Sequence, residues 1–428
     1  MEVNKKQWVE NGLGGLQHLF VSNAWLDPIY VAAAAGLSLN LSTNLINTIF
    51  IFSGLVTLTQ VTKIVRLPIV QGPSAAFDGL MINAGKSGQL AGASGSILIS
   101  ALIVFFLSVT GLINKLVKVL TPAITGTLIF LVGISLSGFT LSEFLGGFPG
   151  GDTFATGQTL FLSIVTALVV IFLSVFGKGF WKRFSFLIAL VVGDILAFST
   201  GAVNYGAVAD KPWFGLPHFM PYGGFKFDWA LFLTFFIAYI VAVCESLGVY
   251  QAAGDAIEEN ISTKRMRNGL IGESSGSIIS SLFGGFPTTA FAQIVGILKL
   301  TGNLSRVPIV IAGTLLILMG FVPKIGAFLA LTPDPVIGGI FLPAVTSLVM
   351  VGFKIIKRAE STNANQMIIG LSIVLAISLP TYATGFSGLM KELLSNAILI
   401  GAVSSIVLQT VLINIPAFFS KKRANNAE

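Results

Sequence analysis

Long apolar segments recur along almost the whole chain, and short polar loops separate them. A transmembrane helix needs about 20 predominantly apolar residues, and the hydrophobic pattern predicts about fourteen such segments. Gly, Pro and charged residues mark their limits, which we place at 13–35, 39–62, 66–85, 92–113, 117–139, 158–177, 184–202, 228–250, 267–285, 286–301, 304–322, 325–352, 366–385 and 391–416. We therefore expect an all-α polytopic membrane protein that is embedded in a lipid bilayer.

The composition agrees with this interpretation. Charged residues make up 10% of the 428 residues and hydrophobic residues 54%, whereas soluble domains carry about 25% charged residues. No polar stretch is long enough for a separate nucleotide-binding or catalytic domain, which excludes a pump with its own cytosolic motor. The net charge of +7 does not point to a nucleic acid partner in such a chain. No cofactor or metal is expected.

The positive charges are distributed unevenly between the loops. If the N-terminus is cytoplasmic, most of the 25 Lys and Arg residues fall in alternate loops, as is typical of the cytoplasmic side of membrane proteins. They are Lys5, Lys6, Lys63, Arg66, Lys115, Lys118, Lys178, Lys182, Arg183, Lys264, Arg265, Arg267, Lys299, Arg306, Lys354, Lys357, Arg358, Lys421, Lys422 and Arg423. This bias predicts a plasma (inner) membrane protein with both termini in the cytoplasm.

The two halves of the chain repeat the same interruptions. Pro122 aligns with Pro335, and Pro73 with Pro287, at offsets close to half the chain length. We therefore expect two seven-span repeats, at 13–202 and 228–416, and an odd number of spans gives the second repeat the opposite orientation. Inverted repeats are typical of secondary transporters, which bind their substrate at the midplane where broken helices meet. Chance recurrence of Pro in a chain with 47 Gly is the alternative.

The third and tenth segments contain breaks that no continuous helix can span. Pro68 and Pro73 lack backbone donors, and Pro287 follows two glycines. Extended backbone inside a membrane persists only where protein covers it or where it lines a cavity. We expect half-helices from about Ala75 and about Ala290, with free N–H groups and positive dipole ends that suit carbonyl oxygens or anions. Two Pro kinks filled by neighbouring side chains are the alternative.

Four acidic residues within the predicted spans stand out as candidates, because ionisable groups are costly there and usually functional. Glu245 is the strongest candidate, because Gly248 lies one turn later on the same face and leaves room for a ligand. A desolvated carboxylate readily gains a proton, so Glu245 is a candidate for ligand binding and for proton coupling. A carboxylate capped by neighbouring helices is the alternative. Glu273 and Asp194 could be functional or structural, and Asp78 is expected to be solvated.

Polar side chains near the breaks are further candidates. Gln293 follows the second break, and its carboxamide can bind an adjacent N–H and C=O pair on a heterocycle, because it both donates and accepts. An interhelical hydrogen bond is the alternative. His18, beside Gln17 in the first segment, either orients a site residue or bridges helices. His218 lies in a loop and is expected to have no special role.

A run of small residues around Ser94 raises a remote alternative, an intramembrane serine protease. Such an enzyme needs a histidine base within hydrogen-bond reach of the serine, and His18 is the only histidine in a predicted span. Close helix packing explains the small residues better. We therefore do not expect an enzyme.

Several motifs, in order along nearly the full chain, resemble those of the nucleobase–ascorbate transporter family, which includes the uracil and xanthine permeases. Each motif alone is weak, but the ordered set is specific. The matching segments are Gln17-His18, Gln71-Gly72-Pro73-Ser74, Thr121 to Gly126, Glu245-Ser246-Leu247-Gly248, Pro287-Thr288-Thr289 with Gln293, Gly296 and Thr301, and Pro333 to Gly339.

The resemblance implies a fold with a core domain (spans 1–4 and 8–11), a gate domain (spans 5–7 and 12–14) and a base bound between the broken spans. It also implies a homodimer in some members. By position, Glu245 would bind ring N–H groups, Gln293 would bind the edge of the base, and backbone near Ala75 and Ala292 would line the site. Gln at position 293 resembles the purine type, whereas uracil carriers tend to have Glu there.

Three positions depart from the family pattern: Ile294 replaces an Asn, Val249 replaces an acidic or His residue, and Ala75 replaces an aromatic residue that stacks on the base. Phe77, two residues later, is the aromatic candidate that remains.

The expected function is uptake of a nucleobase, coupled to a cation and most simply to a proton. An oxo-purine such as xanthine or urate is favoured, and uracil is the other candidate. Glu245 would couple protons, with support from His18, Gln17 and Glu273. The alternative is a sulfate-type anion carrier of the same architecture, which Glu245 disfavours because a carboxylate repels an anion.

Overall fold

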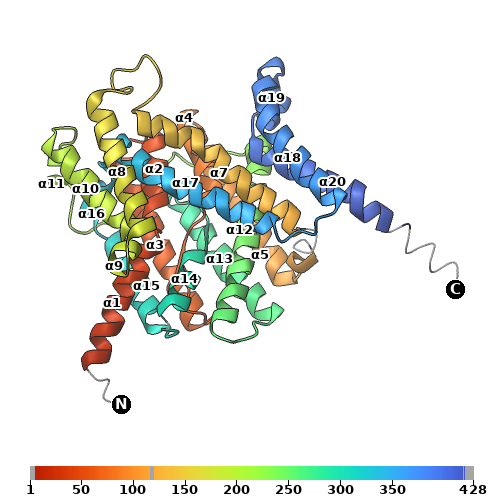
Figure 1. The fold of residues 1–428 in the computed structure, drawn as a ribbon, viewed down its shortest axis with the longest axis horizontal. Coiled ribbons are helices and arrows are strands. Elements are labelled where there is room, and N and C mark those ends of the chain that lie inside the picture. Colours follow the sequence, from red (N-terminus) through yellow and green to blue (C-terminus); the bar gives the residue numbers. More distant parts are fainter. Residues whose placement is uncertain (1–4, 116–119, 302, 418, 420–428) are drawn as a thin grey trace.

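The computed structural model describes residues 5–115, 120–301, 303–417 and 419, and helices make up most of it (Figure 1). Within these residues, eight helices are long and apolar enough to cross a membrane, or nine if the bent pair α15 (Val307–Gly320) and α16 (Pro323–Ala330) counts as one span. The expected count of fourteen stays a prediction. The expected span start at 117 and the basic residues Lys118, Lys421, Lys422 and Arg423 lie outside the described residues.

One group of elements forms the core domain, and it draws on both halves of the chain. The first half supplies α1 (Lys5–Val21), α2 (Leu26–Ala34), α3 (Leu39–Thr62), β1 (Gln71–Pro73), the 3-10 turn η1 (Ala75–Phe77), α4 (Asp78–Lys86) and α5 (Leu90–Thr110). The second half supplies α12 (Trp229–Ala256), α13 (Thr263–Leu282), β2 (Thr288–Ala290), α14 (Ala292–Thr301), α15 (Val307–Gly320) and α16 (Pro323–Ala330). The halves interlock, since α15 packs against α1 and α3, and α12 and α13 pack against α5.

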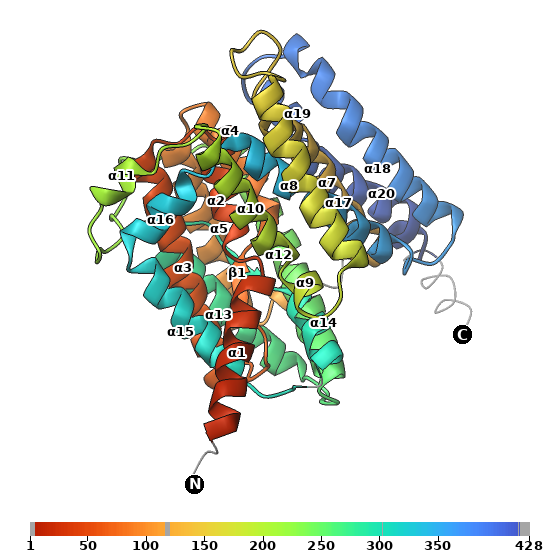
Figure 2. The same cartoon turned by 60° about the vertical axis from the view of Figure 1, so that its left-hand side comes forward.

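The remaining membrane helices form the gate domain, which also combines both halves. Its elements are α7 (Pro122–Leu145), α8 (Gly157–Phe176), α9 (Phe180–Arg183), α10 (Ser185–Ser199), α17 (Asp334–Ile356), α18 (Asn363–Tyr382), the turn η2 (Ala383–Gly385), α19 (Gly388–Leu394), α20 (Ala397–Gln409) and the π-helical turn η3 (Thr410–Asn414). α17 packs along α7 and α8, and α18 and α20 pack together against α7. Figure 2 shows yellow α7 and α8 with blue α17, α18 and α20 beside the core domain. The expected division into core and gate is confirmed.

Two glycines allow the gate helices α7 and α17 to pack closely against each other. A Cβ atom at Gly126, near the start of α7, would lie 2.6 Å from the backbone nitrogen of Ile356, near the end of α17. A Cβ atom at Gly338, near the start of α17, would lie 2.2 Å from the backbone nitrogen of Phe144. Small residues at such crossings let helix backbones approach. The two helices therefore run antiparallel, with each start against the other's end.

Two predicted limits need correction. The predicted span 325–352 is wrong, because α16 ends at Ala330, α17 begins at Asp334, and α16 is bent by 84° from α15. Pro335 lacks an N–H donor, so it suits the first turn of a new helix rather than the interior of a continuous one. The first predicted segment is interrupted as well: Asn23, with a φ of 59°, lies in the turn between α1 and α2.

The two short strands cross in the middle of the core domain, where Figure 2 labels β1. They pair antiparallel, with Gly72 opposite Thr289 and Pro73 opposite Thr288. The expected extended breaks in the third and tenth segments are confirmed.

Candidate functional site

The two breaks pair with each other through β1 and β2, and we call this pair the crossing. Backbone hydrogen bonds between the breaks continue just beyond the ends of the strands. The amide of Ser74 donates to the carbonyl of Pro287 (2.9 Å), and that of Phe291 donates to the carbonyl of Val70 (3.1 Å). These bonds satisfy extended backbone that would otherwise be costly inside a membrane. The first N–H groups of η1 and α14 have no partner in their own helices, so two positive helix ends lie beside the crossing.

Glu245 lies on α12 next to the end of β2. Its neighbour Ser246 is fully buried and accepts a hydrogen bond from the amide of Ala290 (3.2 Å), which fixes α12 against the strand. The Glu245 carboxylate is half-buried and has no hydrogen-bond partner among the described residues. Gly248 is exposed, and a Cβ atom there would meet no atom within 4 Å. The carboxylate is therefore unpaired, and the open space lies one turn further along α12, at Gly248.

The expectation for Asp78 is wrong, because this residue is fully buried rather than solvated. It begins α4, and neither carboxylate oxygen has a hydrogen-bond partner in the described chain. The ring of the preceding Phe77 packs against Phe235 (6.1 Å between centroids) and Tyr239 (5.8 Å) of α12. α12 thus covers the start of α4, which lies inside the core domain.

A third carboxylate, Asp27 on α2, belongs to the same region, and the sequence analysis missed it. Asp27, Asp78 and Glu245 interact electrostatically, and α2 packs against α4. The only signal in the sequence was an acidic residue before a proline inside an apolar segment, a pair that also occurs in loops. Like charges that interact in this way are costly away from water unless they are compensated.

Glu273 supports β1 from behind the site. The Tyr250 hydroxyl donates to Glu273 Oε1 (2.5 Å). It accepts from the side-chain amide nitrogens of Gln60 (3.3 Å) and of Gln71 (3.4 Å), which is the first residue of β1. Gln60 also donates to the carbonyl of Gly269 (2.7 Å). This buried network joins α3, α12 and α13 to the strand, although the side-chain oxygens of Gln60 and Gln71 have no hydrogen-bond partner among the described residues.

The other candidates near the breaks differ in exposure. Ala292 and Gln293, in the first turn of α14, are exposed, and Ala75 is half-buried at the start of η1. Phe77 is fully buried under α12. Their assignment to a binding site stays a prediction.

The remaining sequence candidates lie apart from the crossing. Gln17 accepts a hydrogen bond from Arg183 of α9 (3.2 Å), so it bridges core and gate. His18 is buried, and its Nδ1 has no partner among the described residues. Asp194 accepts from the hydroxyl of Thr332 (3.2 Å) and ties α10 to the turn before α17.

A cavity of 380 Å³ lies between α12 and α13 on the core side and α7 and α17 on the gate side. Ligand sites typically measure about 300–1,000 Å³. The residues that line the cavity are Asn114, Leu120, Pro122, Thr125, Cys244, Leu247, Gly248, Gln251, Thr263, Met266, Ile355 and Arg358. Gly248 and the single cysteine of the chain place this cavity within a turn of Glu245.

At the other end of α7, core and gate are in direct contact. Tyr30 of α2 stacks on Phe341 of α17, with 3.8 Å between ring centroids. Its hydroxyl donates to the carbonyl of Leu136 (3.2 Å) and lies 3.0 Å from the hydroxyl of Thr140. We call Tyr30, Lys86 and the gate residues that they contact the latch.

Lys86 forms the second part of the latch. Its ammonium group at the end of α4 lies 5.1 Å from the ring centroid of Phe139 and interacts electrostatically with Glu143 and Asp334. Glu143 is in the last turn of α7, whereas Pro122, which lines the cavity, is in the first. A helix of 24 residues spans about 36 Å. The latch therefore joins core and gate near the end of α7, and the cavity of 380 Å³ lies toward its start. Another cavity, of 470 Å³, lies beside the latch between α4 and α12 of the core and α19 of the gate.

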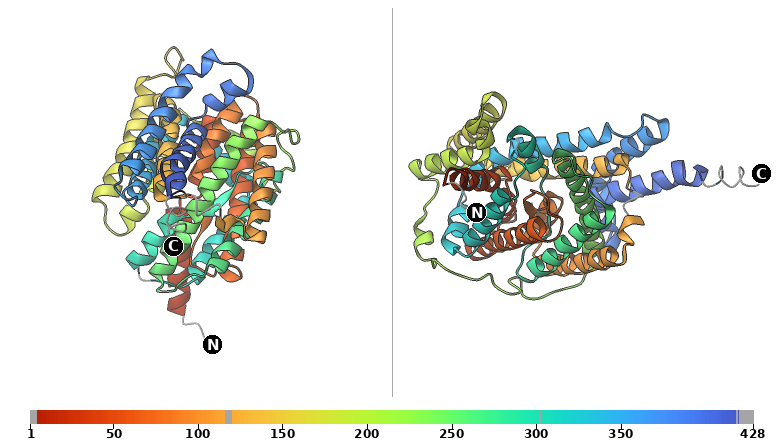
Figure 3. Two further views of the ribbon diagram at one scale, coloured as in Figure 1. Left: turned by 90° about the vertical axis from the view of Figure 1, so that its right-hand side faces the viewer. Right: turned by 90° about the horizontal axis from the view of Figure 1, so that it is seen from below.

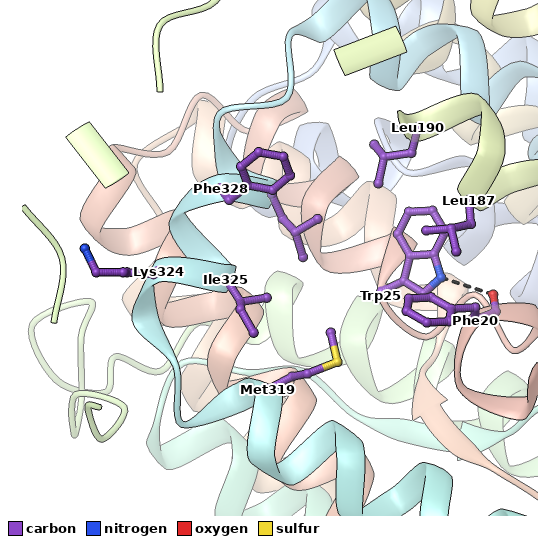
Figure 4. A pocket seen from close by; sticks show the side chains of 9 residues that line it. Phe20, Trp25, Leu187, Leu190, Met319, Lys324, Ile325 and Phe328 are labelled. Atoms are coloured by element: carbon purple, nitrogen blue, oxygen red, sulfur yellow. Dashed lines mark hydrogen bonds between the residues drawn. The ribbon is translucent and has the colours of Figure 1, made fainter. Parts of the chain in front are cut away.

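A third cavity, of 210 Å³, is unsuited to a polar ligand. Figure 4 shows it between α1, α15 and α16 of the core and α10 of the gate. The only polar contact drawn is a hydrogen bond from the indole nitrogen of Trp25 to the carbonyl of Phe20 (3.1 Å). Apolar side chains line the rest, apart from Lys324 at the rim. Recognition of a polar ligand needs several convergent polar groups, which this cavity lacks.

Comparison with known proteins gives consistent matches. The model of a family described as a permease family matches residues 10–385. The uric acid permease PucK of Bacillus subtilis is 30% identical over 424 residues, which cover 97% of this chain and 96% of PucK. The xanthine permease of Bacillus subtilis is 29% identical (94% and 95% covered), and the uric acid transporter UacT of Escherichia coli is 28% identical (92% and 84% covered).

Solved structures match the fold. The transmembrane domain of the cyanobacterial bicarbonate transporter BicA aligns with a TM-score of 0.64 at 14% identity, covering 95% of this chain and 98% of that domain. The murine Solute Carrier 26 family member A9 anion transporter, in its inward-facing state, aligns with a TM-score of 0.62 at 12% identity, covering 96% and 69%. The expected inverted-repeat fold with core and gate domains is thereby confirmed.

Proposed function

The chain belongs to this permease family, the nucleobase–ascorbate transporters, and is a multi-pass integral membrane protein; we propose that it imports an oxo-purine by proton symport. Xanthine and urate are the favoured substrates, and uracil is the other candidate. Relatives named as uric acid and xanthine permeases cover nearly the whole chain, which supports this substrate class. We also propose cytoplasmic termini, repeats at 13–202 and 228–416, and a homodimer.

The observation that carries the proposal is an unpaired carboxylate beside a strand crossing with two free helix ends. An oxo-purine presents ring N–H donors next to carbonyl acceptors. Glu245 accepts from the ring N–H groups, and the amides near Ala75 and Ala292 donate to the carbonyl oxygens. Gln293 binds the remaining edge of the base. Phe77 shapes the site from within the core rather than by stacking on the base.

The acidic cluster of Asp27, Asp78 and Glu245 supports coupling to protons. Three like charges cannot all persist in a buried region without compensation. In this proposal the cluster takes up a proton together with the base, and both are released when the gate rearranges. Glu273 acts through Tyr250 by holding β1 in place. Gln17 and His18 act at the seam between the domains, where Gln17 contacts Arg183.

The rival function is a sulfate-type anion carrier, because BicA and the Solute Carrier 26 member share the fold. Positive helix ends would suit an anion. The acidic cluster disfavours it, since three carboxylates repel a bound anion.

Uptake into liposomes tests the proposal. Purified protein is reconstituted, a pH gradient is imposed, and uptake of labelled xanthine, urate and uracil is measured with and without excess sulfate or bicarbonate. We expect gradient-driven uptake of at least one oxo-purine, which neither anion reduces. Glu245→Gln should abolish the effect of the gradient, whereas Glu258→Gln, in an exposed loop, should not.

Three results would count against the proposal. Uptake of sulfate without uptake of any base would favour the anion carrier. Uptake of uracil alone would overturn the preference for oxo-purines. A Glu245→Gln variant that still responds fully to the pH gradient would remove Glu245 from the coupling mechanism.

A further inference from the structure

The segment that joins the two halves of the chain exposes large apolar side chains. We call residues 210–220 the strap; it follows the short helix α11 (Gly206–Ala209) and leads toward α12. Trp213 is 76% exposed, Phe214 68%, Leu216 70% and Phe219 59%. Four such side chains within seven positions would be unfavourable in water, where apolar area costs about 25 cal/mol per Å². Exposed apolar patches of this kind usually mark an interaction surface.

The strap is fixed to the core domain. The amide of Gly215 donates to the carbonyl of Phe321 just after α15 (3.0 Å), and that of Met220 donates to the carbonyl of Leu282 at the end of α13 (2.8 Å). The amide of His218 donates to the side-chain oxygen of Asn44 in the first turns of α3 (2.7 Å). The backbone of the strap is therefore held in one place. The rings of Phe214 and Phe219 pack against Phe321 (5.6 Å between centroids) and Phe283 (5.8 Å), and each still leaves more than half of its surface exposed.

The side chain of Lys324 helps to hold the exposed indole. Its ammonium group lies 5.3 Å from the ring centroid of Trp213 and donates to the carbonyls of Val208 (3.0 Å) and Ala209 (2.7 Å). A cation over an indole ring stabilises that orientation. Lys324 therefore holds the exposed indole ring of Trp213 in one orientation.

The position of the strap at the ends of membrane helices indicates what its apolar side chains contact. It contacts the ends of α13 and α15 and the start of α3, and membrane spans end where the hydrocarbon core meets the headgroups. Trp229, the first residue of α12, is 62% exposed, and its ring lies 5.0 Å from that of Phe227. Aromatic residues concentrate at this interface. Figure 3 (right) shows the connection between α11 and α12 along the periphery of the core helices, where a bilayer would surround the protein.

We propose that the strap anchors the core domain in the headgroup region of one phospholipid leaflet, through Trp213, Phe214, Leu216 and Phe219. The leaflet is the one at the latch end, because α3 and α12 begin there and α13 and α15 end there. The anchor is independent of the transported substrate. Because the three backbone contacts of the strap are all with core elements, it fixes the depth of the core rather than that of the gate.

Depth-dependent fluorescence quenching tests the anchor. Phe214→Cys and Leu216→Cys are each made in a Cys244→Ser background, which removes the single native cysteine, and are labelled with an environment-sensitive fluorophore. Asp152→Cys, in an exposed polar loop of the gate, is the matched control. The proteins are reconstituted in phosphatidylcholine vesicles that contain nitroxide at the headgroup, at acyl carbon 5 or at acyl carbon 12.

We expect labels at 214 and 216 to be quenched at least twofold by headgroup or carbon-5 nitroxide, less by carbon 12, and little by aqueous iodide. The label at 152 should show the reverse. Quenching of the strap labels by iodide and not by lipid would place the strap in water and overturn the anchor. Protection from both quenchers would mean that protein, such as a second copy of the chain, covers the strap, and it would also overturn the proposal. Trp213→Phe gives a second readout, because it should remove a lipid-quenchable part of the intrinsic fluorescence.

Discussion

The latch predicts how a single hydroxyl group biases the conformation of the protein. Tyr30→Phe keeps the ring that stacks on Phe341 but removes the oxygen that bonds Leu136 and Thr140 of α7. A buried neutral hydrogen bond contributes about 0.5–1.5 kcal/mol net, which corresponds to a factor of about 2 to 13 in an equilibrium constant. Because these two bonds join core to gate at the latched end, the loss of each should lower the ratio of latched to unlatched protein by about that factor.

Cys244 provides the assay without further engineering. It is the only cysteine and lines the cavity between core and gate, far from the latch. If the cavity closes when the latch opens, as the proposed transport cycle requires, the rate of alkylation of Cys244 by a small maleimide is proportional to the latched population. Tyr30→Phe should slow the reaction, and Tyr30→Ala, which also loses the stacked ring, should slow it more. Tyr382→Phe, at a position that is 68% exposed, is the control and should react as the unchanged protein does.

The reasoning would be refuted if Cys244 reacted at the same rate in both Tyr30 variants as in the unchanged protein. Faster alkylation would refute it as well, because it would mean that the Tyr30 contacts favour closure of the cavity rather than closure of the opposite end.

Other predictions concern the packing and the polar network. Gly126→Ala should destabilise the protein by about 1–3 kcal/mol, because its Cβ would lie 2.6 Å from the Ile356 nitrogen, whereas Gly138→Ala, with no atom within 4 Å, should not; chemical unfolding in detergent measures both. Tyr250→Phe removes the donor to Glu273 and should lower the thermal midpoint, since an unsatisfied buried acceptor costs about 1–3 kcal/mol; an unchanged midpoint would show that another group replaces it. Lys86→Met should slow alkylation of the native cysteine, because the latch loses the cation that faces its two acidic residues; an unchanged rate would exclude Lys86 from the latch.

The sequence predicted the features that depend on neighbouring residues alone: the two helix breaks, the candidate Glu245 and the limits of α3. Pro73 and Pro287 cannot continue a helix in any environment, so the two breaks could be placed to within a few residues. Glu245 could be singled out because an acidic residue inside an apolar segment needs a reason. The expected span 39–62 has the same limits as α3, because polar residues flank it closely on both sides.

Features that depend on distant parts of the chain could not be predicted in this way. Asp78 is buried because Phe235 and Tyr239, far along the chain, cover the start of α4. Asp27 becomes a candidate only because the fold brings it near Asp78 and Glu245, which lie on other helices. The division of 325–352 was missed because apolar residues continue on both sides of Pro333, and hydropathy does not distinguish a bent pair of helices from one long span.

The most direct test of the central claim is a structure of the purified protein, in lipid and with saturating xanthine or urate, at a resolution that shows a bound base. We predict density for the base between the ends of β1 and β2, with a ring nitrogen within about 3.2 Å of a Glu245 carboxylate oxygen and a carbonyl oxygen facing the start of η1 or α14. Density for the base elsewhere, with Glu245 unoccupied, would contradict the account.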